Sequence, residues 1–244
     1  KPSAALRTLR AEAGCVVTLA GTVANQQNLS PRFVERLMAI YRNTTLAKQE
    51  LEGLIIEHDA ALWKAGDFAG WRCARPESFD LVVVGVDPPA GVGGAACGII
   101  VAGRRGERAF VLADASVRDA SPLGWANAVR AAAEAYGARA VVAEANQGGQ
   151  MVRATLASAG VACAIKLVHA REGKRARAEP VAALYEQGRI GHCGDFPALE
   201  EELMALGEPE MEGRLDRADA LVWALTHLLV EAPPMRGEPR MGWI

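Results

Sequence analysis

Four acidic residues stand at positions where metal chemistry is possible. Asp87 ends an apolar run and is followed at once by two prolines, and Glu144 ends a second apolar run. Asp216 and Asp219 lie three residues apart, so they share one face of a helix if this segment is helical. Because all four side chains offer hard oxygen ligands, their types favour Mg²⁺ or Mn²⁺ over zinc or copper.

The chemistry that such a set of acids predicts is phosphodiester hydrolysis. Two carboxylates at one edge of a sheet repel each other and raise each other's pKa, and a divalent cation removes that penalty. In a two-metal mechanism one ion activates a water molecule and the other stabilises the leaving oxygen. We find no Ser-His-Asp or Cys-His arrangement in the sequence, and this mechanism needs no nucleophilic side chain.

Each acid also has an ordinary structural interpretation. A single acid at the end of a strand, such as Asp87, is often a turn or cap residue. Asp216 can be the N-cap of a helix, and Asp219 can complement the positive end of the helix dipole. The two interpretations are compatible, because a helix start is also a rigid platform for metal ligands.

The segments around these acids predict an α/β fold with a mixed sheet of the RNase H-like kind. Three strand-like runs joined by Gly-rich turns favour an antiparallel meander. A helix, a strand, a helix, a strand and then three helices follow. We expect the first and fourth strands to be neighbours in the centre of the sheet, which brings Asp87 and Glu144 to the same edge. The strands are expected at 79–87, 96–106, 107–116, 138–146 and 161–168, and the helices at 121–137, 150–160, 177–190, 196–206 and 215–231.

The first quarter of the chain has a different pattern. We expect a strand at 14–22, then helices at 30–43 and 46–62, the first with Ser30 as N-cap and Pro31 as its first residue. Residues 63–78 mix Gly, Pro, charge and tryptophan without a period and are interpreted as a linker.

Composition excludes some classes of function. The formal net charge of −2 and pI near 6.2 give no global attraction to a polyanion, so DNA must be held by a local patch or by metal ions. The five cysteines are odd in number and form no Cys-x-x-Cys pair, so we expect reduced thiols and no zinc site. No apolar run is long enough to span a bilayer, which predicts a cytoplasmic protein.

Two basic groups are candidates for contact with a nucleic-acid backbone. Lys174, Arg175 and Arg177 follow the last predicted strand, close to the edge where the acids should gather. Arg104 and Arg105 lie at the turn of the first hairpin and form a weaker candidate. The alternative for the first group is a solvated loop.

These motifs together resemble the RNase H-like nuclease domain of the large terminase subunit, the DNA-packaging motor of tailed phages and gene transfer agents. The resemblance rests on the strand that ends at Asp87, a hairpin, the D-x-S motif at 114–116, "VVAEANQGGQMV" and the final "DRADAL". Upstream, "VVTLAGTVANQQNLS" and the segment that follows are similar to the end of the terminase ATPase domain.

The resemblance implies roles for these residues. Asp87, Glu144 and Asp216 would bind two Mg²⁺ or Mn²⁺ ions, with Asp219 as a further acid, and the site would cut concatemeric double-stranded DNA during packaging. A portal protein and a small terminase subunit are the implied partners. The implied domains are an ATPase-domain remnant at 1–62, the linker at 63–78, a nuclease domain at 79–232 and a flexible tail at 233–244.

The sequence departs from the complete motor in one respect. It contains no G-x-x-x-x-G-K-[ST] phosphate loop, so we expect no ATP hydrolysis by this chain, which also starts on Lys1 and is interpreted as a fragment. Alternatives are a Holliday-junction resolvase or transposase of the same fold, a sugar-kinase-like ATP-binding domain, and a non-catalytic portal-binding module.

Overall fold

The computed structural model describes residues 14–16, 21–41, 61–89, 96–146, 148–206 and 215–231. Most of the strand expected at 14–22, nearly all of the helix expected at 46–62 and the tail at 233–244 therefore lie outside the described residues. The predictions that can be compared with the structure concern mainly residues 61–231.

The sheet has the predicted centre. β1 (Leu81–Asp87), β2 (Ala96–Arg105) and β3 (Arg108–Asp114) form an antiparallel meander. β5 (Ala140–Glu144) pairs in parallel with β1, and β6 (Ala164–Val168) pairs in parallel with β5. The order is β6-β5-β1-β2-β3-β7, so the first and fourth predicted strands are neighbours as expected.

Two short strands were not predicted. β4 (Val117–Arg118) pairs with the start of β2, and β7 (Ile190–His192) pairs in parallel with β3. The helix expected at 177–190 is therefore wrong at its C-terminal end, because α7 (Lys174–Glu186) stops before β7. The β7 segment is too short to carry a periodic signal, and only its pairing with β3 makes it a strand.

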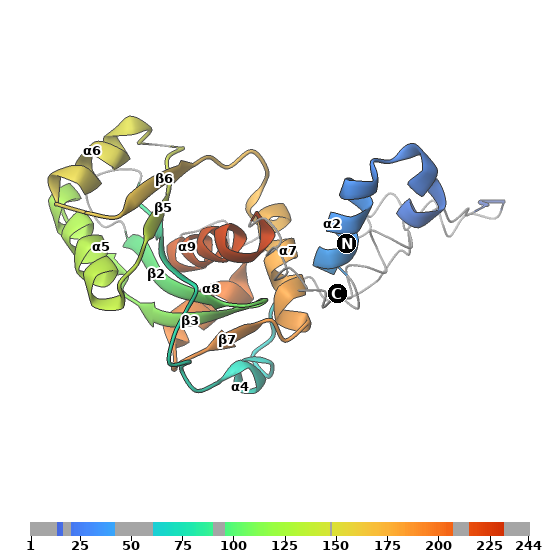
Figure 1. Ribbon diagram of the computed structural model, residues 1–244, viewed down its shortest axis with the longest axis horizontal. Coiled ribbons are helices and arrows are strands. Elements are labelled where there is room, and N and C mark those ends of the chain that lie inside the picture. The colour runs from blue at the N-terminus through green and yellow to red at the C-terminus, as the bar shows by residue number, and fades with distance from the viewer. Residues whose placement is uncertain are drawn as a thin grey trace, which may run out of the picture.

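Helices cover both faces of the sheet (Figure 1). α5 (Pro122–Tyr136) and α6 (Gln150–Ser158) pack on one face around Val84, Ile99 and Val141. α7, α8 (Pro197–Ala205) and α9 (Asp216–Leu225) pack on the other face around Val83 and Ile100. Alternate β1 residues thus enter different cores, as the two-residue period of a strand requires.

The caps of α5 match the sequence prediction. The Ser121 hydroxyl accepts a hydrogen bond from the Gly124 amide, Pro122 is the first helical residue, and the helix ends on Gly137. The last predicted helix continues from α9 into a π-helical turn, Thr226–Val230. The first part of this segment is therefore regular, and its end is not.

The segment before β1 is partly packed into the nuclease core. It contains the short helix α4 (Phe68–Trp71), and the side chains of Trp63 and Phe68 are buried in the core that holds α7, α8 and α9. Further upstream, a 3₁₀ helix (Thr22–Asn28) leads into α2 (Pro31–Tyr41), which lies beside α7 in Figure 1. The Arg36 guanidinium donates a hydrogen bond to the Val230 carbonyl oxygen at 3.0 Å.

None of the described helices combines the length and the apolar character that crossing a bilayer would require.

Candidate active site

Asp87 lies at the end of β1, in the centre of the sheet. Burial is the main cause that raises its pKa, to about 8, and the charges of Asp219, Glu144 and Asp216 act in the same direction. Lys174 lowers the pKa of Asp87 but does not offset these effects. The acids that the sequence singled out therefore lie near enough to act on one another electrostatically.

Glu144 ends β5, the parallel neighbour of β1, and three side chains hold its carboxylate. The Asn146 amide donates to Oε1 at 2.8 Å. The Trp223 indole Nε1 donates to Oε2 at 2.6 Å, and Arg177 Nη1 donates to the same oxygen at 3.2 Å. Asn146 in turn accepts a hydrogen bond from the Ala170 amide, which links the loops that follow β5 and β6.

α9 carries the other two acids and lies unusually close to the sheet. A Cβ atom on Gly98 would be 1.8 Å from the carbonyl oxygen of Asp216, and one on Gly85 would be 2.1 Å from that of Ala220. Gly98 is the residue that faces Asp87 across the β1–β2 ladder. Only glycine allows this approach, which places the first turn of α9 over the end of β1.

Asp219 is buried, with 3% of its side chain exposed, and is paired with two cations from α7. Arg177 Nη2 donates to Oδ1 at 3.0 Å, and the Lys174 ammonium lies 2.5 Å from Oδ2. Arg177 also stacks over the Trp223 ring, 4.7 Å from its centroid. Burial alone would lower the pKa of Lys174, but its hydrogen bond and charge interaction with Asp219 outweigh burial and raise it.

The basic group on α7 lies where it was predicted but takes another form. The expected loop is wrong from Lys174 onward, because α7 begins there. Arg177 is only 10% exposed and contacts Glu144 and Asp219, whereas Arg175 is more exposed and pairs with Glu179. Lys174 and Arg177 thus face the acids, and their predicted role in contacting DNA remains a prediction.

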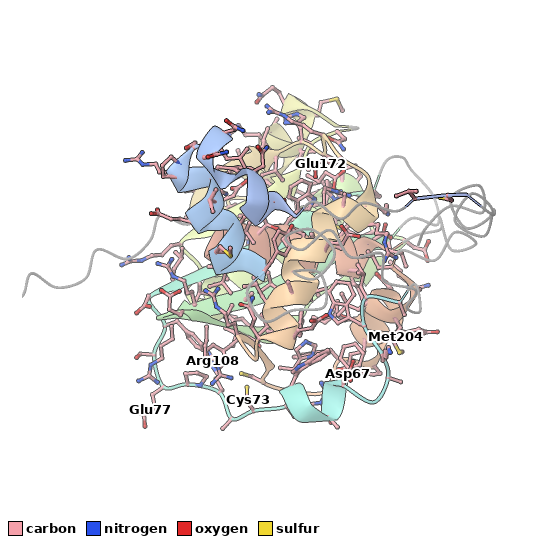
Figure 2. The ribbon with its side chains drawn as sticks, turned by 90° about the vertical axis from the view of Figure 1, so that its right-hand side faces the viewer. Asp67, Cys73, Glu77, Arg108, Glu172 and Met204 are labelled. Atoms are coloured by element: carbon pink, nitrogen blue, oxygen red, sulfur yellow. The ribbon has the colours of Figure 1, made fainter. Side chains whose placement is uncertain are left out.

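Arg104 and Arg105 lie at the other end of the sheet. In the β1–β2 ladder Arg104 faces Leu81, the first residue of β1, whereas the acid Asp87 is the last. Figure 2 shows the same separation: Arg108, which pairs with Arg105, lies far from Glu172 in the loop before α7. The structure does not bring these arginines together with the acids.

The donor set fits a hard divalent cation, although the carboxylates are engaged by side chains. Within the described ranges, no three His, Cys, Asp or Glu side chains form a preformed metal-binding group. The four acids supply oxygen ligands alone, which suits Mg²⁺ or Mn²⁺. Lys174 and Arg177 provide positive charge at the same carboxylates, so a metal ion would have to replace these contacts.

Sequence reasoning missed several residues that hold the acids. Trp223 was interpreted as a packing anchor, yet its indole binds Glu144. Glu202, Arg217 and Asp114 form an ion-pair cluster at the start of α9. Asp114 belongs to the D-x-S motif, which was the one available signal; Glu202 had none, because its partner lies 15 residues away.

The Asp216 N-cap interpretation is wrong. The N-cap position of α9 is Leu215, and Asp216 is the first helical residue. Asp216 and Asp219 both remain in the first turn, so favourable interaction with the helix dipole applies to both.

Comparisons with solved structures point to one class of protein. The large terminase nuclease of the thermophilic phage G20c with bound magnesium is 18% identical, with a TM-score of 0.51 over 64% of this chain and 84% of that chain. The nuclease domain of the large terminase subunit of bacterial virus Sf6 is 14% identical, with a TM-score of 0.51 over 71% of this chain and 99% of that one. Other structures of the G20c nuclease contain zinc or cobalt.

A longer relative extends the similarity upstream. The large terminase of another thermophilic bacteriophage, in complex with ADP, is 13% identical, with a TM-score of 0.61 over 85% of this chain. The chain spans about half, 54%, of that protein. No curated protein matches.

The family comparison agrees with the fold and with the predicted resemblance. The model of the terminase RNaseH-like domain matches residues 84–228, which include most of β1, all four acids and α9. Because the match covers more than half of its residues, this chain belongs to the terminase RNaseH-like domain family.

Proposed function

We propose that this terminase-type nuclease is an endonuclease that cuts double-stranded DNA with two Mg²⁺ or Mn²⁺ ions held by Asp87, Glu144, Asp216 and Asp219. The observation that carries the proposal is the pKa of Asp87, raised to about 8 by burial and by the three other acids. Such a cluster costs stability in the absence of a cation. A site for divalent ions explains why the chain keeps it.

The rigid core is well suited to hold these ligands. Asp87 and Glu144 end adjacent parallel strands, and α9 is packed against β1 and β2 through glycine contacts. When bound, the two ions would supply an activated water and stabilise the leaving oxygen. The chain's own part is to orient the carboxylates, which Asn146 and Trp223 do for Glu144.

We infer that DNA reaches this edge along the start of α7. Lys174 and Arg175 are partly exposed there, and a nearly neutral protein needs local cations to bind a phosphate backbone. Arg104 and Arg105 would form a second contact, with a duplex long enough to pass the far end of β2.

We further infer that the natural substrate is concatemeric DNA and that a portal protein and a small terminase subunit are partners. Family membership and the similarity to the longer, ADP-bound large terminase support this inference. Co-purification of this chain with each purified partner tests it. Binding to neither would restrict the proposal to the nuclease reaction.

Cleavage of supercoiled plasmid in Mn²⁺, in Mg²⁺ and in EDTA tests the nuclease proposal. We expect cutting with either metal and none in EDTA, and we expect Asp87→Ala and Glu144→Ala to abolish it. Glu201→Ala is the control, because this glutamate is exposed on α8. Cutting that survives loss of both acids would refute the assigned site, and no cutting by the unaltered chain in either metal would favour the portal-binding module.

A further inference from the structure

The helix that carries two of the acids has no capping side chain of its own. The residue at the N-cap of α9 is Leu215, which is buried and has no acceptor atom, and no side-chain cap is made from that position. The first amides of a helix lack partners within the helix and need acceptors from elsewhere. The start of α9 therefore depends on another part of the chain.

Glu202, on α8, supplies those acceptors. Its Oε2 accepts hydrogen bonds from the amides of Arg217 at 2.7 Å and of Ala218 at 3.1 Å. Its Oε1 accepts a third hydrogen bond, from the Arg217 side chain, at 2.9 Å. One carboxylate thus binds both the backbone and a side chain of the first turn of α9.

The Arg217 guanidinium extends this contact to the sheet. Its Nε donates to Asp114 Oδ2 at 2.8 Å, and Asp114 Oδ1 accepts from the Ser116 amide at 3.0 Å. The Ser116 hydroxyl accepts from the Ile99 amide of β2 at 3.0 Å. The exposed fractions of the Glu202, Arg217 and Asp114 side chains are only 14%, 11% and 17%, so water screens these ion pairs weakly.

The bound amides belong to residues next to the acids. Arg217 directly follows Asp216, and Ala218 directly precedes Asp219. A shift of this first turn would move both carboxylates relative to Asp87. Because Arg217 balances the charge of Glu202, the cap adds no net negative charge to the site.

We propose that Glu202 is a positioning residue for the metal site, acting through the first turn of α9 on Asp216 and Asp219. This inference rests on the proposed function, because it assumes that the two acids bind divalent ions. Glu202 itself is not a ligand. Residues that orient metal ligands typically change metal affinity by about 10- to 100-fold when they are replaced.

Mn²⁺ binding to the purified chain tests the proposal, measured by calorimetry and by the electron paramagnetic resonance spectrum of the bound ion. The variants are Glu202→Ala, which removes all three contacts, and Glu202→Gln, which keeps an acceptor oxygen but loses the charge that faces Arg217. The matched control is Ser121→Ala, which removes the cap of α5, a helix that carries none of the four acids. Thermal unfolding in EDTA reports the stability of each variant.

We expect Glu202→Ala to weaken Mn²⁺ binding by about 10-fold or more and Glu202→Gln to weaken it less. Ser121→Ala should lower the unfolding temperature and leave the Mn²⁺ affinity and spectrum unchanged. Unchanged affinity in Glu202→Ala, or an equal loss in Ser121→Ala, would overturn the proposal. If Glu202→Ala does not fold, Glu202→Gln decides: unchanged affinity there also overturns it.

The unaltered chain separates the two hypotheses. If it binds neither Mn²⁺ nor Mg²⁺, the proposed function fails and the positioning role fails with it. If it binds metal and cuts DNA while the Glu202 variants bind Mn²⁺ normally, only the positioning role fails.

Discussion

Two buried polar clusters of this protein differ in how their charges are balanced. At the acid edge, the carboxyl groups of Asp87, Glu144, Asp216 and Asp219 face the basic side chains of Lys174 and Arg177. Around β7, the Tyr185 hydroxyl and His192 Nε2 lie 2.7 Å apart, and Arg72 pairs with Glu200 and Asp195. Both clusters connect elements far apart in the sequence.

The difference lies in what burial does to each cluster. Burial lowers the pKa of His192 to about 4 and raises that of Tyr185, so both rings are neutral near pH 7. The β7 cluster thereby reduces its charge and satisfies its polar atoms internally. The acid edge keeps more carboxyl groups than cations among the described residues, which suits a site for metal ions better than a structural contact.

The sharpest way to separate the two clusters is Asp87→Asn. We expect at least about a 1000-fold loss of cleavage, which corresponds to about 4 kcal/mol. The thermal stability in EDTA should not fall, because an amide of the same shape removes a charge from beside three other acids. Plasmid cleavage and thermal unfolding measure the two effects, and a marked loss of stability would mean that Asp87 is structural.

The β7 cluster should respond to acid. Neutral His192 is favoured in the folded state, whereas an unfolded histidine has a pKa near 6.5. Its contribution to stability is therefore present above pH 6.5 and is lost as the pH falls toward 4, by about 3 kcal/mol at 1.36 kcal/mol for each pKa unit. Urea unfolding at several pH values measures this loss, and His192→Gln should flatten it; the same slope in the variant would assign the effect to other groups.

Arg177→Met should affect the acid edge in two opposite directions. Removing a mostly buried counter-ion from Glu144 and Asp219 should lower the metal-free free energy of unfolding by about 2 kcal/mol. The same change removes a competitor for a metal ion, so Mn²⁺ should bind about 10-fold more tightly, or about 1.4 kcal/mol. Arg175→Met, at the more exposed neighbour, is the control. Weaker Mn²⁺ binding in Arg177→Met would show that the arginine orients the acids instead of competing.

The smallest expected effect concerns DNA. The double variant Lys174→Gln/Arg175→Gln should weaken duplex binding a few-fold and lower the slope of log affinity against log salt by about 1 to 2. Arg104→Gln/Arg105→Gln, at the far end of the sheet, should have less effect. Fluorescence anisotropy at several salt concentrations measures both, and an equal or larger loss in the second variant would move the DNA path to the hairpin.

The centre of the fold could be predicted because its signals are local. The strands around Asp87 and Glu144 are short apolar runs closed by turns, and α5 has its cap and stop residues in place. β7 could not be predicted, since a strand of only 3 residues carries no period of its own. The start of α7 was missed because a basic, Gly-containing stretch resembles a loop until Lys174 and Arg177 find their acidic partners.

For the site, the sequence by itself determined which acids meet. Parallel neighbours end at the same edge, so the order of the strands was enough to bring Glu144 to Asp87, and the spacing of Asp216 and Asp219 was enough to put both in one helical turn. Tertiary structure alone decided what surrounds them: the Trp223 contact to Glu144 spans 79 residues, the Arg177 contact spans 33, and Arg217 reaches Asp114 across 103. Such contacts depend on how packed helices are placed, and no local pattern of residues encodes that placement.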